Sequence, residues 1–69
     1  MNMEPVESSN VKSVGYDPES QTMRVEFQGG KTYEYGDVSP AKHSALMTSD
    51  SKGGHFHTHI RGQHPHRKL

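Results

Sequence analysis

Apolar and polar residues alternate along three consecutive segments in the first half of the chain, residues 11–16, 22–27 and 31–35. A period of two residues is typical of a β-strand with one buried face. The segments are separated by Asp17-Pro18-Glu19-Ser20 and by Gln28-Gly29-Gly30. Both sequences favour tight turns, because proline fixes φ and glycine adopts positive φ without steric cost. We therefore predict an antiparallel meander of three strands.

The alternation also predicts which side chains form the core of this meander. Successive side chains of a strand point to opposite faces, so the apolar ones gather on one face. The residues expected there are Val14, Tyr16, Met23, Val25, Phe27, Tyr33 and Tyr35. A Phe→Ala substitution in a core costs about 3–5 kcal/mol, comparable to the whole stability of a small domain. We therefore expect Phe27→Ala to unfold or strongly destabilise the chain.

The hydrophobic period changes after residue 38, which predicts helices. Ser39 can cap a helix through its hydroxyl, and Pro40 suits the first helical position. The narrow apolar stripe of this helix consists of Ala41, Ala45 and Leu46, with Met47 beside it. The two alanines would let the helix sit close to the sheet. Residues 52–61 form either a second short helix or an extended segment, and the spacing of Phe56 and Ile60 favours the helix.

These elements predict one small α+β domain, a three-stranded antiparallel meander packed by one or two short helices. Residues 11–61 form the domain, residues 1–10 a loose lead-in, and residues 62–69 a flexible basic, histidine-rich tail. With 69 residues, of which 28% are apolar, there is room for one small core only.

Composition also bears on the compartment. The chain has no cysteine, which fits a reducing environment. It has no apolar run near the roughly 18 residues that a membrane span needs. The first ten residues hold acids and serines rather than the apolar stretch of a signal peptide. We therefore expect a cytoplasmic protein with no membrane association.

Charge is distributed unevenly, although the formal net charge is zero. Residues 1–39 hold seven acidic and three basic side chains, whereas residues 40–69 hold one acidic and five basic side chains and all six histidines. Such a dipole favours oriented docking on a charged partner, and the alternative is a solvated surface with no role. The candidate partner-binding residues are Glu19, Glu26 and Glu34 on the acidic side and Lys52 and Arg61 on the basic side.

Several short motifs occur in an order that resembles a known family. They are Val6, Ser8-Ser9-Asn10-Val11, Val14-Gly15-Tyr16-Asp17, Met23, Val25, Phe27, Gly30, Tyr33-x-Tyr35, Val38, Ser51-Lys52-Gly53, Phe56 and Ile60-Arg61. Together they resemble the KTSC domain, a short module found alone in bacterial and phage proteins and at the C-terminus of some lysyl-tRNA synthetases. The resemblance covers residues 6–62. It implies a small sheet with packed helices and brings no established catalytic residues.

Two positions depart from the pattern of that family. Ser39 is inserted where the family usually runs from valine directly to proline, and an aromatic residue expected on the helix is replaced near His43. Both departures affect how the helix starts and packs.

A free-standing chain of this size also resembles the small regulators of lytic phages that bind the host RNA polymerase. This resemblance implies a monomer that docks on bacterial RNA polymerase, near nucleic acid, and alters transcription by inhibition, antitermination or both. The first alternative is an accessory RNA- or DNA-binding module that uses the Lys52–Arg61 region. Tyr33 and Tyr35 could serve such a module as a stacking platform, unless they are buried in the core. The second alternative is a metal-responsive module built on the histidines.

His55, His57 and His59 are the candidate metal ligands. On a strand all three would share one face and could hold Zn²⁺, whereas on a helix only His55 and His59 do. The strand geometry conflicts with Phe56 and Ile60 as joint core anchors. We therefore expect no functional metal site and no cofactor.

The last candidate is an anion site in a glycine-containing segment, consisting of Ser51, Lys52, Gly53 and Gly54. Glycine exposes backbone N–H groups and Lys52 adds charge, but a simple break between two helices explains the same residues. Ser51, His57 and Asp50 supply the residue types of a hydrolase, yet no nucleophile elbow is present. A chain this small also has little depth for a water-excluded pocket, so we expect no enzymatic activity.

Overall fold

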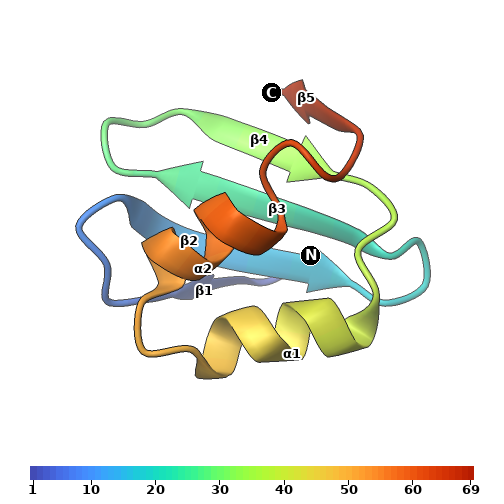
Figure 1. The fold of residues 1–69 in the computed structure, drawn as a ribbon. Coiled ribbons are helices and arrows are strands. Elements are labelled where there is room, and N and C mark those ends of the chain that lie inside the picture. The colour runs from blue at the N-terminus through green and yellow to red at the C-terminus, as the bar shows by residue number, and fades with distance from the viewer.

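The computed structural model describes residues 1–69 as a five-stranded sheet with two helices on one face (Figure 1). In chain order the elements are β1 (Met3–Pro5), β2 (Val11–Asp17), β3 (Thr22–Phe27), β4 (Thr32–Tyr35), α1 (Pro40–Thr48), α2 (Lys52–His59) and β5 (His66–Lys68). Neighbouring strands pair antiparallel in the order β1-β2-β3-β4-β5. The predicted α+β class and the central meander are confirmed. Neither helix has the length and apolar character needed to cross a bilayer.

The number of strands was predicted wrongly, because both terminal segments add a strand. The supposed lead-in 1–10 contains β1, which pairs with β2 through Met3 opposite Gly15. The supposed flexible tail 62–69 contains β5, which pairs with β4 through His66 opposite Tyr35. Each added strand has three residues and no apolar alternation. Backbone hydrogen bonds to an existing edge hold them, and no side-chain pattern reports such bonds.

Side-chain contacts also fix the C-terminal segment to the body of the domain. The ring of His64 lies between two groups, with Nδ1 3.1 Å from the Gly36 carbonyl oxygen and Nε2 2.9 Å from Nζ of Lys42. Since a carbonyl only accepts, Nδ1 carries the proton and Nε2 accepts from the lysine. The backbone N–H of Gly36 donates to the carbonyl of Pro65 at 2.8 Å. This segment therefore leads into β5 along a defined path.

The strand register places the apolar side chains against the helices as the alternation predicted. Val14 lies opposite Val25, which lies opposite Tyr33, so one face of three strands is continuous. A bulge in β2 between Val11 and Ser13 lets Val11 join the same face. The nine core residues are Val11, Val14, Met23, Val25, Tyr35, Val38, Leu46, Phe56 and Ile60. Tyr16, Phe27 and Tyr33, predicted to be core, are only partly buried against this cluster.

Helix α1 begins as predicted but turns a different stripe toward the sheet. The Ser39 hydroxyl accepts from the Lys42 backbone N–H at 3.2 Å, and Pro40 opens the helix. Leu46 is buried, whereas both alanines of the predicted stripe are exposed. His43 instead stacks face to face on Tyr16, with ring centroids 4.4 Å apart and planes 6° apart. The imidazole of His43 thus packs as an aromatic ring at the contact between helix and sheet, in place of the alanines that were predicted there.

Helix α2 confirms the prediction of a second short helix. Phe56 and Ile60, four residues apart, are both buried and anchor it to the core. The Ser51 hydroxyl caps its N-terminus by accepting from the Gly54 backbone N–H at 3.3 Å. Because α2 has only eight residues, it covers part of the inner face of the sheet and leaves the rest beside it open.

Candidate ligand-binding groove

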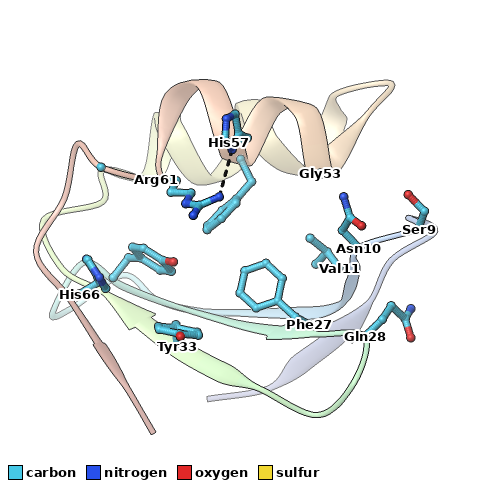
Figure 2. Close-up of a pocket in the computed structure, with 13 residues that line it drawn as sticks. Ser9, Asn10, Val11, Phe27, Gln28, Tyr33, Gly53, His57, Arg61 and His66 are labelled. Carbon is cyan, nitrogen blue, oxygen red and sulfur yellow. Dashed lines mark hydrogen bonds between the residues drawn. The ribbon is translucent and has the colours of Figure 1, made fainter.

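A groove of about 790 Å³ lies between α2 and the inner face of the sheet (Figure 2). Its volume falls within the range of sites that bind small molecules. Its apolar lining consists of Val11, Phe27, Tyr33, Tyr35 and Phe56. Its polar lining consists of Ser9, Asn10, Gln28, His57, Arg61 and His66. No carboxylate lines the groove, so its charge is positive.

Aromatic rings form the floor of the groove. Phe27 lies edge-to-face against Phe56, with centroids 5.4 Å apart, and against Tyr33, with centroids 6.0 Å apart. Tyr35 makes the same kind of contact with Phe56 at 5.1 Å. Such pairs add to the stability gained from burial alone. Tyr35 and Phe56 are buried, whereas Phe27 and Tyr33 remain accessible and offer ring surface to a ligand.

Cationic and imidazole side chains gather at one end of the groove (Figure 2). Nη1 of Arg61 lies 3.4 Å from Nδ1 of His57, one helical turn away, and donates to it. His66 of β5 stacks on Tyr35, with centroids 5.5 Å apart and planes 27° apart. Lys68 lies directly opposite Tyr33 in the register and so is on the same face of the sheet. This end suits an anionic group of a ligand.

The opposite end of the groove is formed by two loops that the sequence places far apart. The backbone N–H of Gln28 donates to the carbonyl of Asn10 at 2.8 Å, which joins the β1–β2 loop to the β3–β4 hairpin. The backbone of the first loop is fixed by the Ser8 hydroxyl, which accepts from the N–H groups of Asn10 and Val11 at 3.2 Å each. The side chains of Ser9, Asn10 and Gln28 are left to line the groove.

The predicted anion-binding residues form the first turn of α2. Ser51 caps the helix through Gly54, and Nζ of Lys52 donates to the carbonyl of Ser49 at 3.1 Å. Three of these groups thus have partners within the chain. Gly53 alone lines the groove, where a Cβ would lie 3.5 Å from Nδ2 of Asn10. Its lack of a side chain lets α2 approach the loop closely.

The three candidate metal ligands diverge. His55 and His59 lie side by side on α2, with ring centroids 4.3 Å apart, while His57 lines the groove next to Arg61. Burial, followed by the neighbouring His59, lowers the pKa of His55 below its usual value. No group of three or more histidine or carboxylate side chains is close enough together to hold a metal ion.

The candidate partner-binding residues lie apart, with Glu19 in the turn between β2 and β3. Glu26 and Glu34 alternate with inward-facing residues and so project from the outer face, and Lys52 and Arg61 lie on the helix side. Glu34 forms ion pairs with Arg24 and with Arg67, the latter at 3.1 Å. The hydrogen bond from Arg24, followed by that from Arg67, lowers the pKa of Glu34 although burial opposes the shift.

Strand β5 therefore mixes the two halves of the charge pattern, because it brings Arg67 from the basic half onto Glu34 of the acidic half. Of the predicted charged residues only Arg61 belongs to the groove. Sequence reasoning missed Ser9, Asn10 and Gln28 as groove residues. Ser9 and Asn10 stand within the motif Ser8-Ser9-Asn10-Val11 of the family resemblance, and this motif was the one signal in the sequence that marked them.

Comparisons with known proteins agree with this fold. The family model described as the KTSC domain matches residues 7–64. An uncharacterized protein of Stutzerimonas stutzeri is 44% identical over 59 residues, which cover 86% of this chain and 83% of that protein. A lysine–tRNA ligase of Nostoc punctiforme is 36% identical over 63 residues, which cover 91% of this chain but 11% of the ligase.

Among solved structures, the crystal structure of a KTSC domain protein from Yersinia pestis is similar over nearly the whole chain. The TM-score is 0.93 with 36% sequence identity, and the match covers 99% of this chain and 96% of that protein. The family model and the solved structure agree on one assignment. The chain belongs to the KTSC domain family.

Proposed function

We propose that the chain is a non-enzymatic binding module whose groove holds a segment of single-stranded RNA. The observation that carries this proposal is the combination of accessible aromatic rings with Arg61 in a groove that no carboxylate lines. Stacking of a base on an aromatic ring contributes about 1–3 kcal/mol in single-strand-binding proteins and tolerates every base. Phe27 and Tyr33 offer the rings, and Arg61 supplies a positive charge for a phosphate.

The family relatives support RNA as the ligand. A similar segment makes up 11% of a lysine–tRNA ligase of Nostoc punctiforme, a protein whose name refers to an RNA substrate. A small module attached to such an enzyme would add contacts to RNA. The formal net charge of zero limits long-range attraction, so affinity would depend on the local charge of the groove.

The side chains of the groove favour binding over catalysis. General acid–base or nucleophilic catalysis needs a base that a third group orients toward a nucleophile. His57 is hydrogen-bonded to Arg61, and His66 packs on a tyrosine ring. With no carboxylate in the lining, neither histidine has an acidic partner there to orient it.

Docking on a bacterial RNA polymerase, with an effect on transcription, is the second candidate. What favours it is that Glu26 projects from the outer face of the sheet, whereas Arg61 lies on the helix side. Charge separated in this way can orient a small protein on a larger one. The ion pairs of Glu34 weaken the acidic side of this arrangement.

Fluorescence anisotropy of a labelled single-stranded RNA of mixed sequence tests the first candidate. Arg61→Gln should weaken binding and reduce the slope of log affinity against log salt by about 0.7, the value for one phosphate contact on a single strand. Arg67→Gln is the matched control, because it removes the same charge from the outer face.

Failure of the chain to bind RNA, or equal effects of both substitutions, would contradict the proposal. In that case purified bacterial RNA polymerase becomes the probe. Binding of polymerase to the full chain in the presence of nuclease would favour the second candidate.

A further inference from the structure

The groove has two chemically different ends separated by its aromatic floor (Figure 2). Arg61 and His66 lie at one end, and the side chains of Asn10 and Gln28 lie at the other. Phe27 lies between these two ends, on the inner face of the sheet. A nucleotide has the same division, with a charged phosphate, a flat base and a polar base edge.

The amide end is built on fixed backbone. The hydrogen bond from the Gln28 N–H to the Asn10 carbonyl holds the two residues together at 2.8 Å. Val11 and Phe27, the residues next to them, are paired in the register of β2 and β3. Gly53 of α2 lies above Asn10, where a Cβ would come within 3.5 Å of the amide nitrogen. The backbones of Asn10 and Gln28 are therefore fixed side by side, and both residues line this end of the groove.

The amide end of the groove carries side chains that match the edge of a base. Stacking on Phe27 and Tyr33 tolerates any base, and contact of a phosphate with Arg61 carries no sequence information. An amide side chain offers a donor and an acceptor side by side. Asparagine and glutamine match adenine in this way, through its N6 amino group and N7. Unpaired bases expose these edges to protein side chains.

We propose that the groove binds one unpaired adenosine of an RNA strand, with the base on Phe27 and Tyr33 and its polar edge against Asn10 and Gln28. This inference rests on the proposed function and adds to it a base preference and the residues that determine it. Arg61 contributes affinity for any sequence, and the two amides contribute the preference.

Anisotropy measurements of the full chain with labelled oligo(A), oligo(C) and oligo(U) of equal length test the proposal. Oligo(A) should bind about tenfold more tightly than the other two, the discrimination expected of one good bidentate contact. Asn10→Ala and Gln28→Ala should bring oligo(A) to the level of the other strands. Arg61→Gln should weaken all three by the same factor and keep the preference.

Asn2→Ala and Gln63→Ala are matched controls, because both amides are exposed and lie outside the groove. They should leave the preference unchanged. Gln28→Glu provides a second variant of nearly the same size. Because a carboxylate only accepts and matches the amino group of cytosine, this variant should shift the ratio of affinities from oligo(A) toward oligo(C).

The outcomes separate this inference from the proposed function. Equal binding of all three strands, with loss of affinity in Arg61→Gln, would overturn the adenosine preference and leave RNA binding in place. A preference for oligo(A) that survives both alanine substitutions would overturn the role of the amides. No binding of any strand would overturn both proposals.

Discussion

The structure lowers the expected cost of Phe27→Ala below that of a fully buried phenylalanine. Phe27 is only partly buried, with edge-to-face contacts to Phe56 and Tyr33. At least half of the roughly 1.5–3 kcal/mol for full burial of phenylalanine, together with about 0.5–1.5 kcal/mol for each of the two aromatic pairs, gives about 2–4.5 kcal/mol. No cavity term is added, because the groove is already open to solvent.

Thermal unfolding followed by circular dichroism measures this cost. For a domain of this size about 1 kcal/mol shifts the midpoint by roughly 4–8 °C, so the expected decrease is about 10–35 °C. Met23→Ala is the comparison within the core, because Met23 is 0% exposed and methionine truncations in a core cost about 2–5 kcal/mol. Phe27→Leu, which keeps apolar volume but removes the ring, should fall between the wild type and Phe27→Ala.

Two results would refute this reasoning. An unchanged midpoint in Phe27→Ala would mean that the ring does not make the contacts described. A larger loss in Phe27→Ala than in Met23→Ala would mean that Phe27 is a central core residue and that the groove is closed in solution.

Three further predictions concern titration and metal. Burial lowers the pKa of His43, which stacks on Tyr16, so its contribution to stability is complete above the unfolded value of about 6.5 and is lost as pH falls below it. His43→Phe should make the urea unfolding midpoint less dependent on pH between pH 7 and 5. The same pH dependence as in the wild type would contradict this. The hydrogen bond from Arg24 lowers the pKa of Glu34, so the contribution of Glu34 to stability is lost only as pH falls below about 4.3. Glu34→Gln should therefore lose less stability than the wild type when the pH is lowered below that value. A chelator should leave the melting midpoint unchanged, because the α2 histidines diverge, and a decrease that zinc alone reverses would refute this.

The groove illustrates how far a site can be predicted from the sequence. Tyr33 and Tyr35 were correctly assigned to one face of the sheet. Tyr35 is part of the core because α2 covers it, whereas Tyr33 remains accessible in the floor of the groove. Arg61 was predicted from its charge as a partner-binding residue, and the structure places it in the lining of the groove. Gln28 carries no distinguishing pattern, and Asn10 was marked only by a motif of the resemblance. Their proximity results from the pairing of β2 with β3.

Local interactions explain what the sequence determined by itself. The alternation of residues 22–27, the glycine turn at Gly29 and the Ser39-Pro40 helix start all depend on residues close together in the chain, so their physics can be read from the sequence. Only the tertiary structure decided where β1 and β5 dock, because edge pairing uses backbone groups that every residue has. The groove likewise arises from the short length of α2 over a wide sheet, a relation between elements that no single segment encodes.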